Sequence, residues 1–194
     1  MSAKERCMAK LRSVKELMVP LAEYATVSEK ATLQEAFLAL QASNARLAPG
    51  KRHHRAVLVL DAKGRLVGKI GMMEVVRGLE PKYRQLITPR QGLAHMGFTR
   101  QFIKSMLTHH NLWDEAIDDI CRKASVQTVR DFMYTPEESE YVQVTASLDV
   151  ALHHLVMGSF QSLLVNDGPE VVGILRLSDV FDEIARKVQA CPNA

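Results

Sequence analysis

Paired histidines and one basic run are the first residues in this 194-residue chain whose types could support chemistry. Adjacent histidines occur three times, at 53–54, 109–110 and 153–154. Adjacent side chains on a helix point about 100° apart, so one pair is poorly placed to chelate an ion from one face. A zinc site also needs further ligands. We therefore expect no metal site, and histidines that face solvent or cap helices.

The basic run Lys51–Arg55 comes directly before a strongly apolar stretch, Ala56–Leu60. Arginine is suited to bidentate contact with phosphate, so this run is a candidate anion contact. The alternative is a solvated surface loop, because charged side chains lie mostly on protein surfaces.

No catalytic signature accompanies these residues. The sequence contains no GxSxG, Walker A, HExxH or GxGxxG pattern. No nucleophile with a neighbouring base is visible either. We expect a protein that is not an enzyme by itself and needs no cofactor.

Composition places the chain among ordinary globular proteins, with 47% hydrophobic and 24% charged residues. No apolar stretch approaches the 18 or so residues of a membrane-spanning helix, and residues 1–15 lack the apolar region of a secretory signal. We expect a cytoplasmic protein without a membrane segment. Three widely spaced cysteines favour free thiols over a disulfide framework, with Cys121 in the core.

Charge is unevenly distributed along the chain. Residues 1–110 contain 19 Lys/Arg and 8 Asp/Glu, whereas residues 111–194 contain 6 and 14, so the halves carry +11 and −8. A basic half could meet an anion, an acidic partner or the acidic half of a second copy, and uneven solvated surface is the simpler interpretation.

The chain repeats one order of signals. Val14–Met18 is echoed by Val129–Met133, and each is followed by a short strand-like run. Next come two helix starts, with Thr32 and Ser147 as expected N-caps, and Glu35 completes a capping box with Thr32. The expected strands and turns that follow are, in the first repeat, 56–60, a turn at 61–64 and 66–70, and, in the second, 162–165, a turn at 166–169 and 171–175. A closing helix ends each repeat, so the order β-α-β-β-α is predicted twice.

This double pattern resembles the paired cystathionine-β-synthase (CBS) domain, the Bateman module. The markers are V-x-[DE]-x-M at the start of each repeat, T/S-L-x-x-A at the helix start, and G-h-h-x-x-x-[DE] at the end of the hairpin, where h is apolar. The resemblance implies an α+β fold of two units with pseudo-two-fold symmetry. We expect a first CBS motif at 12–80, a helical insert at 81–126 and a second CBS motif at 127–190.

The resemblance also implies a ligand, an adenosine-containing nucleotide held between the two motifs. In the second repeat the hairpin motif runs from Gly173 to Asp179, and Asp179 matches the carboxylate that binds ribose hydroxyls. Ser178 lies beside it. Arg176 stands where the family has a hydroxyl, so it either contacts phosphate or blocks the pocket. The resemblance adds His54 and Arg55 to this site as phosphate contacts.

Further ligand contacts follow from the same resemblance. The adenine side is expected at Tyr141, Val142, Gln143, Val144 and Leu163, for which ordinary strand core is an equally good interpretation. A second, weaker site is expected around Glu74, with Tyr24, Ala25 and Val27. It is the weaker one because Glu74 is one methylene longer than aspartate and Gly71 lacks a hydroxyl.

The segment between the repeats predicts two helices. The first spans residues 98–110 with Thr99 as its cap, and the second begins at Asn111 and continues to Cys121. Residues 77–110 hold six Lys/Arg and one acid, Glu80. A basic pair of helices suggests a helix-turn-helix that binds nucleic acid. The acidic residues of the second helix argue against this, because they would repel phosphate. A helical lobe packed on the CBS pair is the simplest interpretation.

We therefore expect a regulatory CBS pair, dimeric as such pairs commonly are, that senses AMP, ADP, ATP or S-adenosylmethionine. The first alternative is a ligand-free dimerisation or interaction module that docks an unknown protein through residues 77–125. Binding of nucleic acid by the basic insert is the second.

Overall fold

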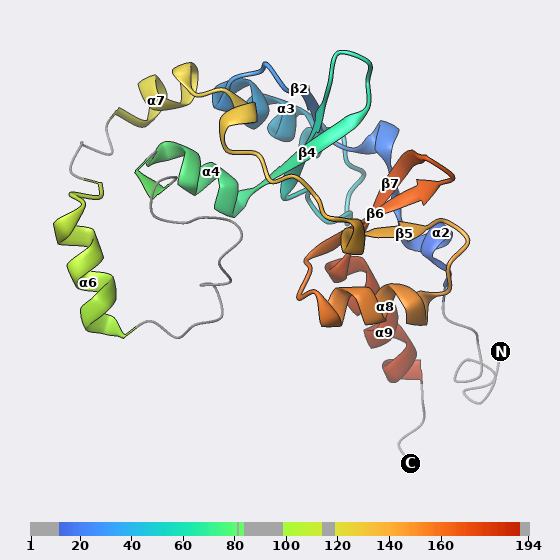
Figure 1. The fold of residues 1–194 in the computed structure, drawn as a ribbon. Coiled ribbons are helices and arrows are strands. Elements are labelled where there is room, and N and C mark those ends of the chain that lie inside the picture. Colours follow the sequence, from blue (N-terminus) through green and yellow to red (C-terminus); the bar gives the residue numbers. More distant parts are fainter. Residues whose placement is uncertain (1–11, 81, 84–98, 114–118, 191–194) are drawn as a thin grey trace. The chain divides into compact units, whose positions relative to one another are not determined.

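The computed structural model describes residues 12–80, 82–83, 99–113 and 119–190 (Figure 1). The chain forms two compact units. Unit 1 joins the N-terminal segment up to Tyr24 to the chain from Pro136 onward, and unit 2 is Ala25–Thr135.

Unit 2 contains the first β-α-β-β-α repeat. Its elements are β2 (Thr26–Ser28), α3 (Leu33–Ala45), β3 (Ala56–Leu60), β4 (Leu66–Gly71) and α4 (Met72–Leu79). The sheet order is β2-β3-β4, with β2 parallel and β4 antiparallel to β3.

Unit 1 contains the second repeat. Its elements are β5 (Tyr141–Gln143), α8 (Leu148–Met157), β6 (Ser162–Asp167), β7 (Glu170–Arg176) and α9 (Leu177–Ala190). Here too β5 is parallel and β7 antiparallel to β6. The predicted α+β class and the doubled order of elements are confirmed.

Local sequence explains the boundaries of these elements. Thr32 caps α3 by accepting the Glu35 backbone N–H at 3.2 Å, and the Glu35 carboxylate accepts the Thr32 N–H at 2.6 Å, which confirms the capping box. The two hairpin turns use Gly64 and Gly168 at φ of 75° and 59°, a left-handed conformation that favours glycine.

The segment that opens each repeat packs with the hairpin of the other repeat. In unit 1, α2 (Val14–Leu17), β1 (Val19–Pro20) and the 3-10 turn η1 (Leu21–Glu23) precede Tyr24, and β1 extends the sheet to β1-β7-β6-β5. In unit 2, the turn η4 (Val129–Asp131) leads to Tyr134, which forms a bridge with Lys69 of β4. The V-x-[DE]-x-M pattern therefore marks an exchanged segment.

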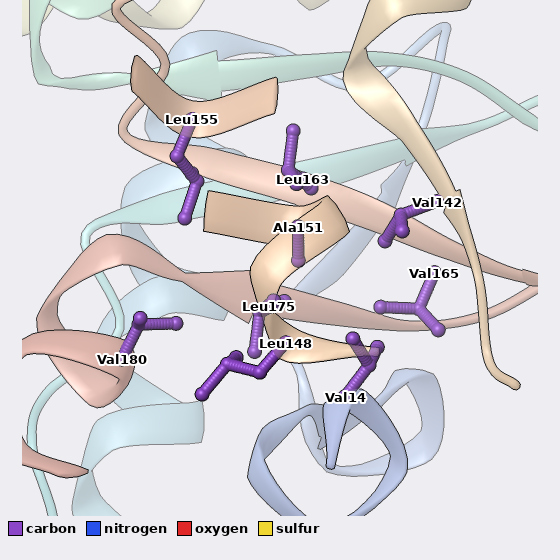
Figure 2. Close-up of a cluster of buried hydrophobic side chains, with 9 residues drawn as sticks. All are labelled: Val14, Val142, Leu148, Ala151, Leu155, Leu163, Val165, Leu175 and Val180. Atoms are coloured by element: carbon purple, nitrogen blue, oxygen red, sulfur yellow. The ribbon is translucent and has the colours of Figure 1, made fainter. Parts of the chain in front are cut away.

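The core of unit 1 lies between one face of its sheet and the helices α2, α8 and α9. Figure 2 shows nine buried side chains converging there. They are Val14, Val142, Leu148, Ala151, Leu155, Leu163, Val165, Leu175 and Val180. Unit 2 repeats the arrangement on a smaller scale, with Val129 of the exchanged segment buried against Ala36, Val59 and Ile70.

Gly173 and Gly68 explain why the hairpin motif begins with glycine. A Cβ on Gly173 would lie 2.6 Å from the Val19 carbonyl oxygen, and one on Gly68 would lie 2.6 Å from the Met133 sulfur. Each glycine therefore admits the exchanged segment against its hairpin.

Gly173→Ala is expected to lower the free energy of unfolding by about 1–2 kcal/mol, because a backbone atom must move to admit the methyl group. Gly71→Ala is the matched control: its new Cβ would meet only the mobile end of Glu74 at 3.0 Å, so little stability should be lost. Urea unfolding of both variants measures the difference. Equal losses would contradict this account of the motif.

The insert agrees in part with the expectation from sequence. Helix α6 (Arg100–His109) is capped by Thr99 as predicted, through the Phe102 N–H at 3.2 Å. The predicted start of the second helix at Asn111 is wrong, because residues 111–113 form a turn with Asn111 and Trp113 at positive φ. Residues 114–118 of that predicted helix lie outside the described residues.

The described helix nearest to that prediction is α7 (Ile120–Val126). Cys121 is exposed on it, so its predicted place in the core is also wrong.

Glu80 explains the turn at 111–113. Its buried carboxylate, on a residue 3% exposed, accepts the Trp113 backbone N–H at 2.7 Å. Trp113 also donates its indole N–H to the Tyr83 hydroxyl at 3.2 Å. This contact, 33 residues along the chain, fixes the backbone of the insert where local pattern predicted a helix.

Candidate functional site

Asp179 lies in the first turn of α9, two residues after the helix begins where β7 ends. The hairpin-to-helix corner positions the carboxylate at the positive end of the helix dipole. Its side chain is 16% exposed, so a small ligand can reach it while most of the group is shielded from water.

Arg176 forms an ion pair with the Asp179 carboxylate. Its Nε donates to Oδ2 of Asp179 at 2.5 Å and its Nη2 to Oδ1 at 2.8 Å, a bidentate pair three residues apart. The Arg176 side chain is only 13% exposed. The arginine that stands at the hydroxyl position therefore neutralises the acid that follows it.

Tyr24 belongs to the same compact unit as Arg176 and Asp179, and the charges of this pair act on its phenol group. The residue is 7% exposed, and burial raises the pKa of its phenol to about 12. The Arg176 charge lowers that pKa and the Asp179 charge raises it, which places the ring in the electrostatic field of both. At neutral pH Tyr24 is an uncharged aromatic neighbour of the ion pair.

The Glu74 carboxylate in unit 2 also has partners within the chain. Its carboxylate accepts the Gly71 N–H at 3.0 Å at the start of α4, and Arg77 lies 3.7 Å away. Ala25 is buried and Val27 is half-buried in the same unit. The predicted members of the weaker site are thus divided, with Tyr24 in unit 1 and the others in unit 2.

His54 is buried, at 3% exposure, in unit 2. Asn44 holds its backbone: Oδ1 accepts the His54 N–H at 2.7 Å and Nδ2 donates to the His54 carbonyl at 3.1 Å. The Ser43 hydroxyl lies 3.1 Å from Nδ1 of the ring. These contacts fix the end of the basic run, whereas Arg55 beside it is exposed.

The architecture that holds these side chains is a doubled β-α-β-β-α unit, and its sequence decides the family. A model of the CBS domain matches residues 14–80 and again 129–186. The chain belongs to the CBS domain family. Its two matched regions form a paired CBS module.

Solved CBS structures share this fold at low sequence identity. The CBS domain of a CBS domain-containing membrane protein from Sphaerobacter thermophilus is 16% identical, with a TM-score of 0.58 and 92% of each chain covered. CBSX2, solved in complex with AMP, is 16% identical with a TM-score of 0.53, and the match covers 91% of this chain and 98% of that one.

The protein MJ1004 from Methanocaldococcus jannaschii is also 16% identical, with a TM-score of 0.54. The match covers 90% of this chain and 60% of MJ1004, so this chain spans less than two thirds of that relative. A comparison with curated proteins found no match.

Several residues expected on the adenine side of the CBS ligand are core residues. Val142 and Leu163 are 5% and 0% exposed and pack in the unit 1 cluster (Figure 2). Val144 is partly buried against that cluster. Only the main-chain atoms of Val142 and Leu163 could meet a ligand. Tyr141 is half-buried and Gln143 exposed, and both line an open hollow at the edge strand β5.

Sequence reasoning missed the pairing of Arg176 with Asp179 in this CBS motif. The signal was available, because Arg176 directly precedes the predicted closing helix, and a residue there can reach an opposite charge three residues later in the first helical turn. Tyr24 gave no such signal, since its partners are more than 150 residues away along the chain.

The described part of the chain contains no group of three or more His, Cys, Asp or Glu side chains that could hold a metal ion. No described helix is long and apolar enough to span a bilayer.

Proposed function

We propose that this CBS pair is a regulatory module that binds an adenosine-containing ligand at Asp179. The observation that carries the proposal is the half-buried Asp179 carboxylate at the corner of β7 and α9, in the position that the family motif gives to the ribose contact. A carboxylate can accept two hydrogen bonds from a cis-diol, and its charge strengthens both. CBSX2, a relative in fold, was solved with AMP.

Arg176 is assigned to the phosphate of that ligand. It replaces the hydroxyl that the family places near the phosphate, and a guanidinium can bridge a carboxylate and a phosphate because its donors point in several directions. The carboxylate orients the guanidinium, and the ligand's phosphate would then add a second anion. That His54 and Arg55 serve the same ligand stays a prediction from the resemblance.

The test is thermal unfolding of the full chain with AMP, ADP, ATP or S-adenosylmethionine. ADP-ribose is the control compound. Ligand at 100 times its dissociation constant should raise the unfolding midpoint by roughly 5–10 °C. Asp179→Asn should remove the shift and Glu74→Gln should leave it. The absence of a shift with every compound would contradict the proposal.

A second function, docking of a partner protein through the insert, has one observation in its favour. Helix α6 has no buried residue, and Phe102, Ile103 and Leu107 are 45–56% exposed. Exposed apolar side chains at helical spacing are typical of helices that pack against a partner. A chain that binds none of the adenosyl compounds would be tested next as such a module, and as the homodimer that CBS pairs commonly form.

A further inference from the structure

The hollow at the edge of unit 1 has a chemistry of its own. Seven residues line it, from the segment before β5, from β5 and β6, and from α8. They are Glu137, Glu138, Ser139, Tyr141, Gln143, His154 and Asn166. None of these seven is Lys or Arg, and two are exposed carboxylates. The hollow therefore presents negative potential and hydrogen-bond acceptors.

Asn166 lacks a hydrogen bond that it needs. Its side-chain Oδ1 is shielded from water and has no partner among the described residues. An unpaired buried acceptor destabilises the fold by the cost of its lost hydration. Asn166 lines the hollow, so a turn of its side chain would bring Oδ1 to an N–H donor of a ligand there and remove that cost.

His154 adds a second acceptor to the lining. Its Nδ1 lies 3.0 Å from the Ser139 carbonyl oxygen, which can only accept, so Nδ1 carries the proton. In the neutral ring Nε2 then carries the lone pair. The contact also holds α8 against the segment that supplies Glu137 and Glu138.

Tyr141 contributes an aromatic face. It is half-buried, and burial together with the neighbouring Glu140 charge raises the pKa of its phenol, so the ring is neutral in assays near pH 8. Glu140 itself is 1% exposed and is not one of the lining residues. A cation over a tyrosine face gains a further attraction.

The first repeat provides an internal comparison, because the strands of the two repeats pair in equivalent registers. Strand β2 pairs Thr26 with Leu58 and Ser28 with Leu60, as β5 pairs Tyr141 with Leu164 and Gln143 with Asn166. Both hairpins also shift register at the same place, Val59/Leu60 and Val165/Asn166.

Four lining residues of the hollow thus have counterparts with different chemistry. By strand pairing, the counterparts of Tyr141, Gln143 and Asn166 are Thr26, Ser28 and Leu60. The counterpart of His154 is Ala39, because the two residues lie at the same position after their helix caps, Ser147 and Thr32. The fold accepts an apolar leucine at the position of Asn166 and an alanine at that of His154. The polar lining of the second repeat is therefore not a requirement of the fold.

We propose that this hollow binds an organic cation that carries N–H donors, an alkylammonium or guanidinium group. Glu137 and Glu138 supply the charge, Asn166 and His154 accept hydrogen bonds, and Tyr141 supplies the aromatic face. Two sources share this chemistry: a free small amine, and a Lys or Arg side chain such as those of residues 99–110 in a second copy. The inference does not depend on nucleotide binding at Asp179.

The experiment is isothermal titration of the full chain at pH 8 and low salt. The probes are putrescine, agmatine, the bis-quaternary hexamethylputrescinium dication and a synthetic peptide of residues 99–110. Putrescine or agmatine should bind at least tenfold more tightly than hexamethylputrescinium, which carries the same two charges without an N–H donor. Saturable binding of the peptide alone, lost in Glu137→Gln/Glu138→Gln, would assign the site to a second copy.

Variants separate the contributions of charge and of hydrogen bonding. Asn166→Leu installs the residue of the first repeat and should weaken the diamine roughly tenfold, whereas Asn166→Asp should strengthen it. Glu137→Gln/Glu138→Gln should weaken it by a similar factor or more. Glu170→Gln, an exposed acid on β7 outside the lining, is the charge control and should have no effect.

Three results would overturn the proposal. They are no saturable binding of any probe, equal binding of hexamethylputrescinium and the diamine, and equal losses in Glu170→Gln and in the double variant. The last two would mean that the cations only screen surface charge. Unfolding midpoints without ligand show that each variant is folded, so a lost signal is assigned to the hollow.

Discussion

Asp179→Asn is expected to weaken binding of AMP by roughly tenfold to a hundredfold, because the neutral amide loses two charge-assisted hydrogen bonds to the ribose. The asparagine keeps the size of the side chain. It also leaves Arg176, 13% exposed, without its carboxylate, so a modest loss of stability should accompany the loss of affinity. Titration calorimetry measures the affinity, and urea unfolding without ligand measures the stability.

Glu74→Gln is the matched control for this prediction, since it makes the same chemical change at the equivalent position of the first CBS motif. It should change AMP affinity by less than about twofold, because we assign the ligand to Asp179. A larger loss in Glu74→Gln than in Asp179→Asn would move the ligand to the first motif and contradict the assignment.

Arg176→Thr distinguishes the two roles that its position allows. Threonine restores the hydroxyl of the family motif and frees the Asp179 carboxylate. If Arg176 contacts phosphate, as we propose, AMP weakens roughly tenfold while adenosine, which has no phosphate, is unchanged. If Arg176 instead blocks the pocket, adenosine and AMP both bind more tightly.

Structural features that depend on a few neighbouring residues were predicted from the sequence and confirmed. The capping box of Thr32 and Glu35 needs only three residues of local chain, and the glycine turns at 64 and 168 need one left-handed residue each. The alternation of apolar runs and turns was strong enough to predict both hairpins and the doubled order of elements.

Signals that depend on distant partners could not be derived from the sequence. The pattern Val14–Met18 shows that the segment is partly apolar, but only the pairing of Val19 with Ile174 shows which hairpin it joins. Asn111 has the composition of a helix cap, yet the buried Glu80 carboxylate binds the Trp113 N–H and produces a turn instead. Exchange of segments and capture by a buried charge are tertiary effects that override local propensity.

For the candidate site, the sequence identified the residues and not their state. Asp179 was selected by its motif, and its place at the start of α9 follows from the hairpin that precedes it. Three-dimensional packing alone shows that its carboxylate is already paired with Arg176. It also shows that the charges of this pair act on the phenol of Tyr24. These facts change the expected ligand contact from a bare carboxylate to a carboxylate–guanidinium pair.

Glu183→Gln is expected to lower the free energy of unfolding at pH 7 by about 3 kcal/mol. The Glu183 side chain is 2% exposed and accepts Arg186 Nε at 2.9 Å, Arg186 Nη2 at 2.6 Å and the Arg12 backbone N–H at 3.1 Å. The hydrogen bonds from Arg186 contribute most to holding its pKa at about 2, well below the usual 4.5. The contact joins the N-terminal segment to α9 within unit 1.

The sign of the pH dependence follows from that lowered pKa. The unfolded chain binds a proton at Glu183 near pH 4.5 and the folded chain only near pH 2, so the stabilisation is complete above pH 4.5. It is lost as the pH falls from about 4.5 toward 2. The difference in stability between wild type and Glu183→Gln should therefore be largest at neutral pH and shrink progressively through this window.

Urea unfolding at pH 7, 5, 4 and 3 measures this difference, with Glu170→Gln as the exposed control, expected within about 0.5 kcal/mol of wild type at each pH. A difference for Glu183→Gln that is the same at pH 3 as at pH 7 would mean that shape, rather than charge, stabilises the contact. The predicted convergence at low pH would instead assign the attachment of the exchanged segment to an ionised, buried carboxylate. Because that segment places Val19 on Gly173 of the hairpin that leads to Asp179, its release at low pH should also weaken binding at Asp179.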